Sequence, residues 1–130
     1  MFVVPTELRP SPIHGVGVFL LVPVKKGDLI WRFDSRIDRV LTKSELESLP
    51  DNVQKFLKIH APWNKETGLW MLYGDNAKYC NHSSKPTLHS INGAFSDDVA
   101  AMDLAVDTEL TGDYNDCYDN KDLLATMGLR

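Results

Sequence analysis

The shortness of its apolar runs is the feature that most constrains how this sequence can fold. Hydrophobic residues occur in brief stretches, some alternating with polar residues, and turn-forming residues separate them. Turns are expected at residues 26–28, at Asn92-Gly93 and at Asp107-Thr108. Six runs are interpreted as β-strands: Val16–Val22, Leu29–Phe33, Ile37–Leu41, Leu69–Tyr73, Thr87–Ile91 and Val99–Leu104. The pattern predicts a mainly β protein of many short strands.

One segment, residues 42–60, departs from this pattern. Thr42 and Glu45 have the spacing of a capping box, which predicts the start of a helical turn. After Pro50, Asp51 is placed to cap a second helix. The segment is therefore interpreted as a helical insert between strands.

The chain is interpreted as a single domain. Its 130 residues are enough to bury a hydrophobic core without disulfides or metals. No linker or internal repeat divides it. The domain covers residues 1–130, with the insert at 42–60 and a C-terminal extension at 115–130 in which Lys121 to Met127 can form a short helix.

Composition excludes several classes of protein. Hydrophobic residues make up 43% and charged residues 25%, an ordinary globular balance that excludes disorder. Two cysteines are too few for a disulfide scaffold. The apolar stretch Val16 to Val24 is too short for a bilayer, which needs about 20 apolar residues, so we expect a soluble, intracellular protein.

Acidic residues are concentrated near the end of the sequence. Residues 1–95 carry a formal charge of +3, whereas residues 96–130 carry −7. Such a segment repels nucleic acid and attracts basic peptides. A solvated acidic surface is the alternative explanation.

The four histidines do not predict a metal site. They are His14, His60, His82 and His89. No pair has the spacing of common metal-binding motifs, and no acidic residue stands beside them in a ligand-like position. We therefore expect no bound metal.

Three other patterns can carry chemistry. Gly15 and Gly17 flank Val16, and glycine lets a backbone approach a ligand closely, although a tight turn also explains them. Asn81 opens a polar cluster and can both donate to and accept from a ligand, with an Asx-type turn as the alternative. Tyr114 ends an acidic stretch, and its hydroxyl can orient a nucleophile, with a core tyrosine as the alternative.

Together these patterns resemble the SET-domain protein lysine methyltransferases. The resemblance runs from about Ser11 to Asp116. The segment from His14 to Phe19 resembles the family's opening glycine segment, Gly74 to Ser83 its central motif, and Asp103 to Tyr114 its closing motif. No zinc-binding cysteine-rich segment follows, so the chain resembles the small stand-alone bacterial or viral type.

The resemblance implies a SET-domain, β-clip-like fold of several small sheets with a pseudoknot. It also implies the cofactor S-adenosyl-L-methionine. Gly15, Val16 and Gly17 would offer backbone contacts to this cofactor. Asn81 would hold its amino-acid end, and His82 would contact its adenine through the backbone.

The implied reaction is methyl transfer to the ε-amine of a lysine in a histone-like or other basic protein. Tyr114 would be the catalytic residue that aims the amine. Trp70, with Tyr73 as the alternative, would line the substrate channel together with Tyr114. Tyr118 or residues 123–127 would cover the adenine.

The implied partners are a basic protein or peptide, with no direct nucleic-acid or membrane binding. A homodimer is one option, because some stand-alone members of the family dimerise. The expected location is the cytoplasm, or a nucleus, including a host nucleus, if the target is a histone. The family usually has Asn where this chain has Thr87. Because of that departure, and because the sequence does not identify which segment covers the adenine, a non-catalytic SET-like binding module is the alternative function.

Overall fold

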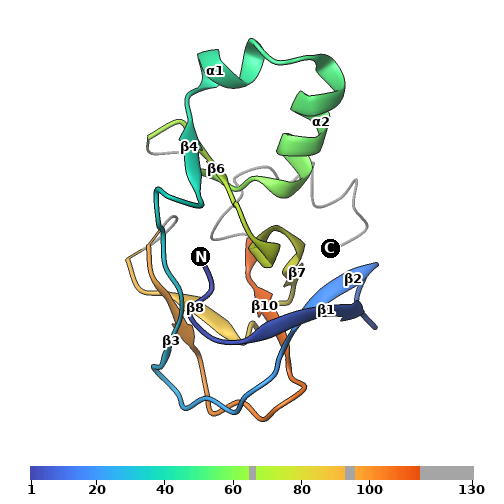
Figure 1. Cartoon of the computed structure of the whole chain (residues 1–130), viewed down its shortest axis with the longest axis vertical. Helices are drawn as coiled ribbons and strands as arrows, with labels where there is room; N and C mark the ends of the chain where they lie inside the picture. The colour runs from blue at the N-terminus through green and yellow to red at the C-terminus, as the bar shows by residue number, and fades with distance from the viewer. Residues whose placement is uncertain (65–66, 93–95, 115–130) are drawn as a thin grey trace.

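A computed structural model describes residues 1–64, 67–92 and 96–114 (Figure 1). The strands within these residues are two to five residues long, in agreement with the short apolar runs. In chain order the elements are β1 (Thr6–Pro10), β2 (Val16–Leu20), β3 (Leu29–Trp31), β4 (Arg39–Leu41), α1 (Lys43–Glu47), α2 (Asp51–His60), β5 (Trp63–Asn64), β6 (Leu69–Leu72), the 3-10 helix η1 (Asn76–Tyr79), β7 (Asn81–His82), β8 (Leu88–Ser90), β9 (Asp98–Ala100) and β10 (Glu109–Gly112).

Two of the small sheets share the main hydrophobic core. One has the strand order β1-β2-β10-β7 and the other β3-β9-β8. Val18 and Leu20 alternate inward from β2 and are fully buried, as is Leu110 from β10. The buried residues of this main core are Val18, Leu20, Val24, Ile30, Leu88, Ala100, Leu104 and Leu110. Burial of each large side chain contributes about 1.5–3 kcal/mol.

The helical insert has a second, smaller core beside the sheet β4-β6-β5 (top of Figure 1). The predicted capping box is confirmed, because Thr42 Oγ1 accepts from the Glu45 backbone at 3.1 Å and Glu45 Oε1 accepts from the Thr42 backbone at 3.3 Å. The buried residues of this smaller core, here called the insert core, are Leu41, Leu46, Leu57 and Ala61.

The second helix begins differently from the prediction. Pro50, with φ −57° and ψ 148°, occupies the capping position, and Asp51 is the first helical residue. Pro50 has no side-chain capping hydrogen bond. The prediction that Asp51 caps this helix is therefore wrong, although its carboxylate still lies near the positive end of the helix dipole.

Every predicted strand overlaps an observed one. The last overlaps least, because β9 starts at Asp98 and ends at Ala100, while Leu104 pairs only with Val24 in an isolated bridge. The turns at Gly27 (φ +86°) and Asp107 (φ +70°) are confirmed. The periodicity did not predict β1, β5, β7 or β10.

Some predictions lie outside the described residues. They are the helix from Lys121 to Met127, the extension at 115–130 and part of the Asn92-Gly93 turn. No helix among the described residues is long and apolar enough to cross a membrane. Among the same residues, no three or more His, Cys, Asp or Glu side chains are grouped to hold a metal ion.

Candidate active site

The central and closing motifs meet where β7 and β10 pair as parallel neighbours (Figure 1). Thr111 lies opposite Asn81, and Gly112 lies opposite His82. On its other side, β10 pairs with β2, which begins within the glycine segment. Parallel neighbours require a long connection, so three segments distant in sequence come together in one sheet. The pseudoknot itself stays a prediction.

The Asn81 side chain ties these segments together. It is only 6% exposed. Its Nδ2 donates to the backbone oxygens of His14 and Val16, both at 3.0 Å, and to Glu109 Oε1 at 2.9 Å. Because all three partners are acceptors, the amide nitrogen must face them. The amide oxygen is then the atom that Asn81 can offer to a ligand's donor group.

Glu109 is the centre of the same network, although its role was not predicted. Ser11 Oγ donates to its two carboxylate oxygens at 2.8 and 3.0 Å. A Cβ atom placed on Gly17 would lie 2.1 Å from Glu109 Oε1, so a side chain at position 17 would displace the Glu109 carboxylate from this network. Gly15 is required for a different reason, since its φ of +48° disfavours L side chains.

Thr87 occupies the position where the family usually has Asn, and it anchors β10 through its hydroxyl. Thr87 Oγ1 accepts from the Thr111 backbone at 2.9 Å and donates to the Glu109 carbonyl at 3.2 Å. In return, the Thr87 backbone donates to Thr111 Oγ1 at 3.1 Å. The altered residue therefore retains a polar connection between this loop and β10.

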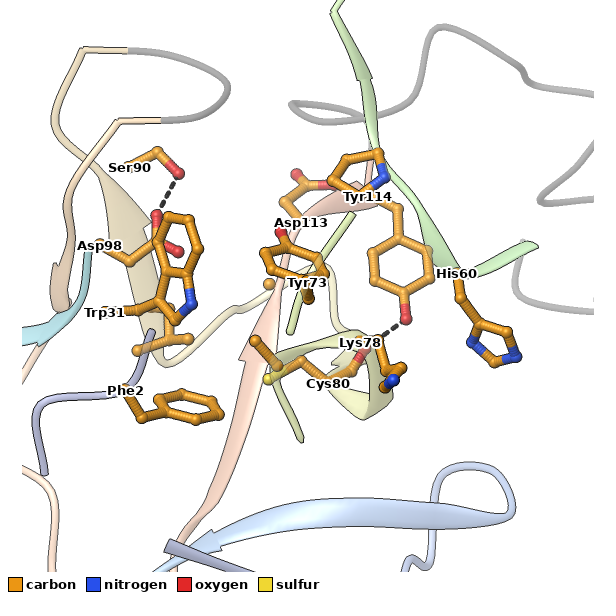
Figure 2. Close-up of a pocket in the computed structure, with 14 residues that line it drawn as sticks. Phe2, Trp31, His60, Tyr73, Lys78, Cys80, Ser90, Asp98, Asp113 and Tyr114 are labelled. Carbon is orange, nitrogen blue, oxygen red and sulfur yellow. Dashed lines mark hydrogen bonds between the residues drawn. The ribbon is translucent and has the colours of Figure 1, made fainter. Parts of the chain in front are cut away.

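Tyr114 is held from both ends. Its backbone N–H donates to His82 Nδ1 at 3.0 Å, whereas Asp113 Oδ1 lies 3.7 Å from the same nitrogen. The shorter contact requires Nδ1 to be an acceptor, so the neutral imidazole carries its proton on Nε2. The Tyr114 hydroxyl donates to the carbonyl oxygen of Cys80 (Figure 2). These two contacts fix the ring beside a pocket.

The pocket has a volume of about 70 Å³ and is largely aromatic (Figure 2). Phe2, Trp31, Tyr73 and Tyr114 contribute to its wall. The rings of Trp31 and Tyr73 meet edge to face, 5.3 Å apart. An apolar wall of this kind disfavours an isolated charge by desolvation, so the pocket suits a slender, uncharged or locally neutralised group.

Tyr73 lies on this pocket, and Trp70 does not. Trp70 packs on the insert core and lies 6.1 Å from the ring of Trp63, whereas Tyr73 packs with Trp31 and Met71. Side chains alternate along β6, and Tyr73, the residue after its end, packs with Met71, whereas Trp70 packs with Leu72 on the other cluster. Of the two residues predicted for a substrate channel, Tyr73 therefore borders this pocket, whereas Trp70 packs elsewhere.

Three polar or aromatic pocket residues escaped sequence analysis. Trp31 lies opposite Asp98 across β3 and β9, and Ser90 lies opposite Asp98 across β8 and β9. Ser90 Oγ donates to Asp98 Oδ1 at 2.5 Å. Burial raises the pKa of Asp98, although this hydrogen bond opposes the effect. These residues become neighbours through the register of β9 with the adjacent strand β8 and with β3, which is distant in sequence.

His60 was predicted only as part of a helix face, yet it also lines the pocket. It ends α2, and its ring lies 4.7 Å from that of Phe56 and 5.9 Å from that of Tyr79. Burial lowers the pKa of His60. Tyr118, the other predicted contact to the cofactor, lies outside the described residues.

Comparisons with known proteins bear on the fold. No protein-family model and no curated protein sequence matches the chain. Solved structures of the Chaetomium thermophilum Polycomb Repressive Complex 2 are among those that match it. One, in an autoinhibited conformation bound to S-adenosylmethionine, has a TM-score of 0.67 over 96% of this chain at 16% identity. Another, a humanised mutant bound to the inhibitor GSK126, has a TM-score of 0.67 over 94% at 17% identity.

A Plasmodium falciparum protein described as a histone methyltransferase also matches, with a TM-score of 0.56 and 22% identity. That match covers 83% of this chain and 90% of the other. The matched proteins contain SET domains. The chain has a SET-like fold. It spans 16% of the length of each matched Polycomb chain, and at these identities the likeness concerns the fold alone.

The residues beside the glycine segment fit a cationic cofactor. The Glu109 carboxylate, the Asn81 amide oxygen and the carbonyls of His14 and Val16 are all acceptors. No Lys or Arg of the described chain forms an ion pair with Glu109. S-adenosylmethionine has an ammonium and a sulfonium group, and an acceptor-rich, acidic niche favours both.

Proposed function

We propose that the chain is an S-adenosyl-L-methionine-dependent methyltransferase that acts on the ε-amine of a lysine in a basic protein. One observation carries the proposal. The amide of Asn81 binds both the glycine segment and Glu109, in the closing motif that ends at Tyr114. This network lies in the same sheet as the strand that leads to Tyr114 and its aromatic pocket.

In the proposed site, the cofactor lies against the glycine segment. Gly15, Val16 and Gly17 offer backbone groups, Asn81 offers its amide oxygen to the amino-acid end, and the backbone of His82 contacts the adenine. The cofactor supplies a methyl group bonded to a positively charged sulfur. The acceptors around Asn81 stabilise its positive charge.

The pocket at Tyr73 and Tyr114 is the proposed lysine channel. Free lysine has a pKa of about 10.4, and the aromatic wall disfavours its charged form. Because the Tyr114 hydroxyl uses its hydrogen on Cys80, its oxygen is the acceptor that aims an N–H of the amine. Alignment of the amine supplies much of the rate, without a covalent intermediate.

The proposed substrate is basic because acidic residues predominate beside the pocket and after it in the sequence. Asp97 is exposed and adjoins the pocket residue Asp98, and residues 96–130 carry a formal charge of −7. These charges favour a Lys/Arg-rich peptide and repel nucleic acid. A histone-like protein fits this description, and a homodimer and a nuclear or cytoplasmic location remain proposals.

The proposal is tested by transfer of a radiolabelled methyl group from S-adenosylmethionine to a lysine-rich protein, with the arginine-substituted protein as the control. We expect labelling of the lysine form alone. Tyr114→Phe should reduce the rate by about 100-fold, because the amine loses its alignment, and should still bind S-adenosylhomocysteine. Cofactor binding by the parent without any transfer would instead identify a non-catalytic binding module.

A further inference from the structure

One end of the pocket is formed by three side chains from adjacent strands. Asp98 lies between Trp31 and Ser90, its direct partners on the neighbouring strands, with a register shift in β3 between Leu29 and Trp31. All three side chains line the pocket. The Ser90 hydroxyl, which donates to Asp98 Oδ1 at 2.5 Å, fixes the carboxylate there (Figure 2). We call these three residues the acidic end of the pocket.

Trp31 provides a second, independent sign that a hydrogen-bond acceptor, such as the oxygen of a bridging water, belongs beside the acidic end. Its side chain is 2% exposed, and within the described part of the chain its buried Nε1 has no hydrogen-bond partner. Figure 2 shows this nitrogen on the side of the indole that faces Tyr73 and Cys80. A buried donor without an acceptor is unfavourable and rare in native proteins.

Asp98 has no cationic side chain to neutralise it. No Lys or Arg of the described chain forms an ion pair with it. The titratable groups that act on it or share its pocket are Asp97, His89, the Met1 amino group, His60, Lys78 and Asp113. A half-buried carboxylate in this setting needs either a proton or a cationic ligand.

We propose that Asp98 accepts the proton of the substrate amine at the acidic end. The inference rests on the proposed methyltransferase activity and assigns a base to it. An aromatic pocket disfavours separated charges, so an ammonium entering beside Asp98 has a strong tendency to become neutral. Burial of Asp98, which raises the pKa of its carboxyl, makes the carboxylate a better proton acceptor.

The proton transfer balances in atoms and charge. One N–H bond of the lysine ammonium breaks, its electron pair stays on nitrogen, and an O–H bond forms on Asp98, directly or through one water. A cation and an anion become a neutral amine and a neutral carboxylic acid. The nitrogen then has the lone pair that nucleophilic attack requires, and the proton on Asp98 returns to solvent when the product leaves.

The pH dependence of kcat/KM for a lysine peptide tests this role, with Asp98→Asn compared with the parent. In the parent, the rate should be flat from about pH 7 to pH 9, between the ionisations of Asp98 and lysine. In Asp98→Asn the amine must lose its proton to bulk water. The rate should then be about 100-fold lower at pH 7 and rise tenfold per pH unit.

Two further variants make the result specific. Asp97→Asn removes an exposed charge from the adjacent position, so it should lower kcat/KM by weakening the attraction of the peptide but keep the flat profile. Ser90→Ala should move the acidic limb of the profile to higher pH, because the Ser90 hydrogen bond lowers the pKa of Asp98. An Asp98→Asn profile as flat as that of the parent would overturn the proposal.

Binding of n-butylamine separates failure of this inference from failure of the proposed function. Measured by calorimetry, the affinity of the parent for n-butylamine should be constant over the same pH range. The affinity of Asp98→Asn should rise tenfold per pH unit. Equal pH dependence in both proteins, or no binding by the parent, would overturn the role of Asp98 even if methyl transfer occurs. Binding that depends on Asp98 without any methyl transfer would overturn the proposed function instead.

Discussion

The main core and the insert core differ in how far apart in sequence their residues lie. In the main core, Val18 of β2 packs with Leu110 of β10, which belong to segments near opposite ends of the described chain. In the insert core, all four buried residues lie within residues 41–61. The candidate active site adjoins the main core, because β10 joins β2 to β7. The comparison indicates that the insert core can change while the Asn81–Glu109 network stays intact, although His60 at the end of α2 still borders the pocket.

The largest expected difference comes from one leucine in each core. Leu110→Ala should cost about 4 kcal/mol of unfolding free energy and abolish S-adenosylhomocysteine binding, because a fully buried side chain of β10 is lost. Leu46→Ala should cost about 2–3 kcal/mol and leave the affinity unchanged in the folded fraction. Denaturant unfolding and calorimetry measure both quantities, and equal losses of affinity would contradict the separation of the two regions.

A smaller effect is expected where Thr87 anchors β10. Thr87→Val keeps the side-chain volume but leaves the Thr111 N–H without its acceptor. We expect a cost of about 2 kcal/mol and weaker binding of S-adenosylhomocysteine, because β10 carries Glu109. Thr42→Val, at the capping box of the insert, is the matched control and should leave that affinity unchanged. A loss of affinity in the control alone would reverse the comparison.

The smallest expected effect is a gain in stability, whereas the preceding substitutions cause losses. Because burial raises the pKa of Asp98 above its ordinary value, the folded state binds this proton more readily than the unfolded chain. Its stabilising contribution is present at low pH and is lost as pH rises through the folded pKa. Asp98→Asn should therefore raise Tm at neutral pH, with the gain disappearing at acidic pH. Tm measured against pH in the parent and in Asp98→Asn checks the sign.

Local signals predicted the insert and the positions of six strands. The capping box at Thr42 and Glu45 involves residues that contact each other within one turn, so spacing alone is enough to predict it. Strands such as β2 carry their own apolar run. By contrast, β7 is only two residues long, and its partner β10 lies far along the chain. The segments that form these two strands were singled out by their resemblance to the family's central and closing motifs, not by periodicity.

Side-chain direction at the pocket could not be predicted from sequence. Alternation along β6 separates Trp70 from Tyr73, but the face that borders the pocket depends on which sheet packs there. Asp98 and Ser90 form neighbours only through the register of β8 and β9. The sequence around Asp98 therefore did not predict that its carboxylate lies at the pocket wall.

Stabilisation by S-adenosylhomocysteine tests the central claim most directly, because it depends on the Asn81–Glu109 network and not on the substrate. At about 100 times its Kd, the ligand should add about 2.7 kcal/mol and raise Tm by several degrees. Glu109→Gln should lose most of this gain, whereas Glu47→Gln, an exposed change in the insert, should keep it. No gain in the parent, or an equal gain in Glu109→Gln, would contradict the assignment of the cofactor site.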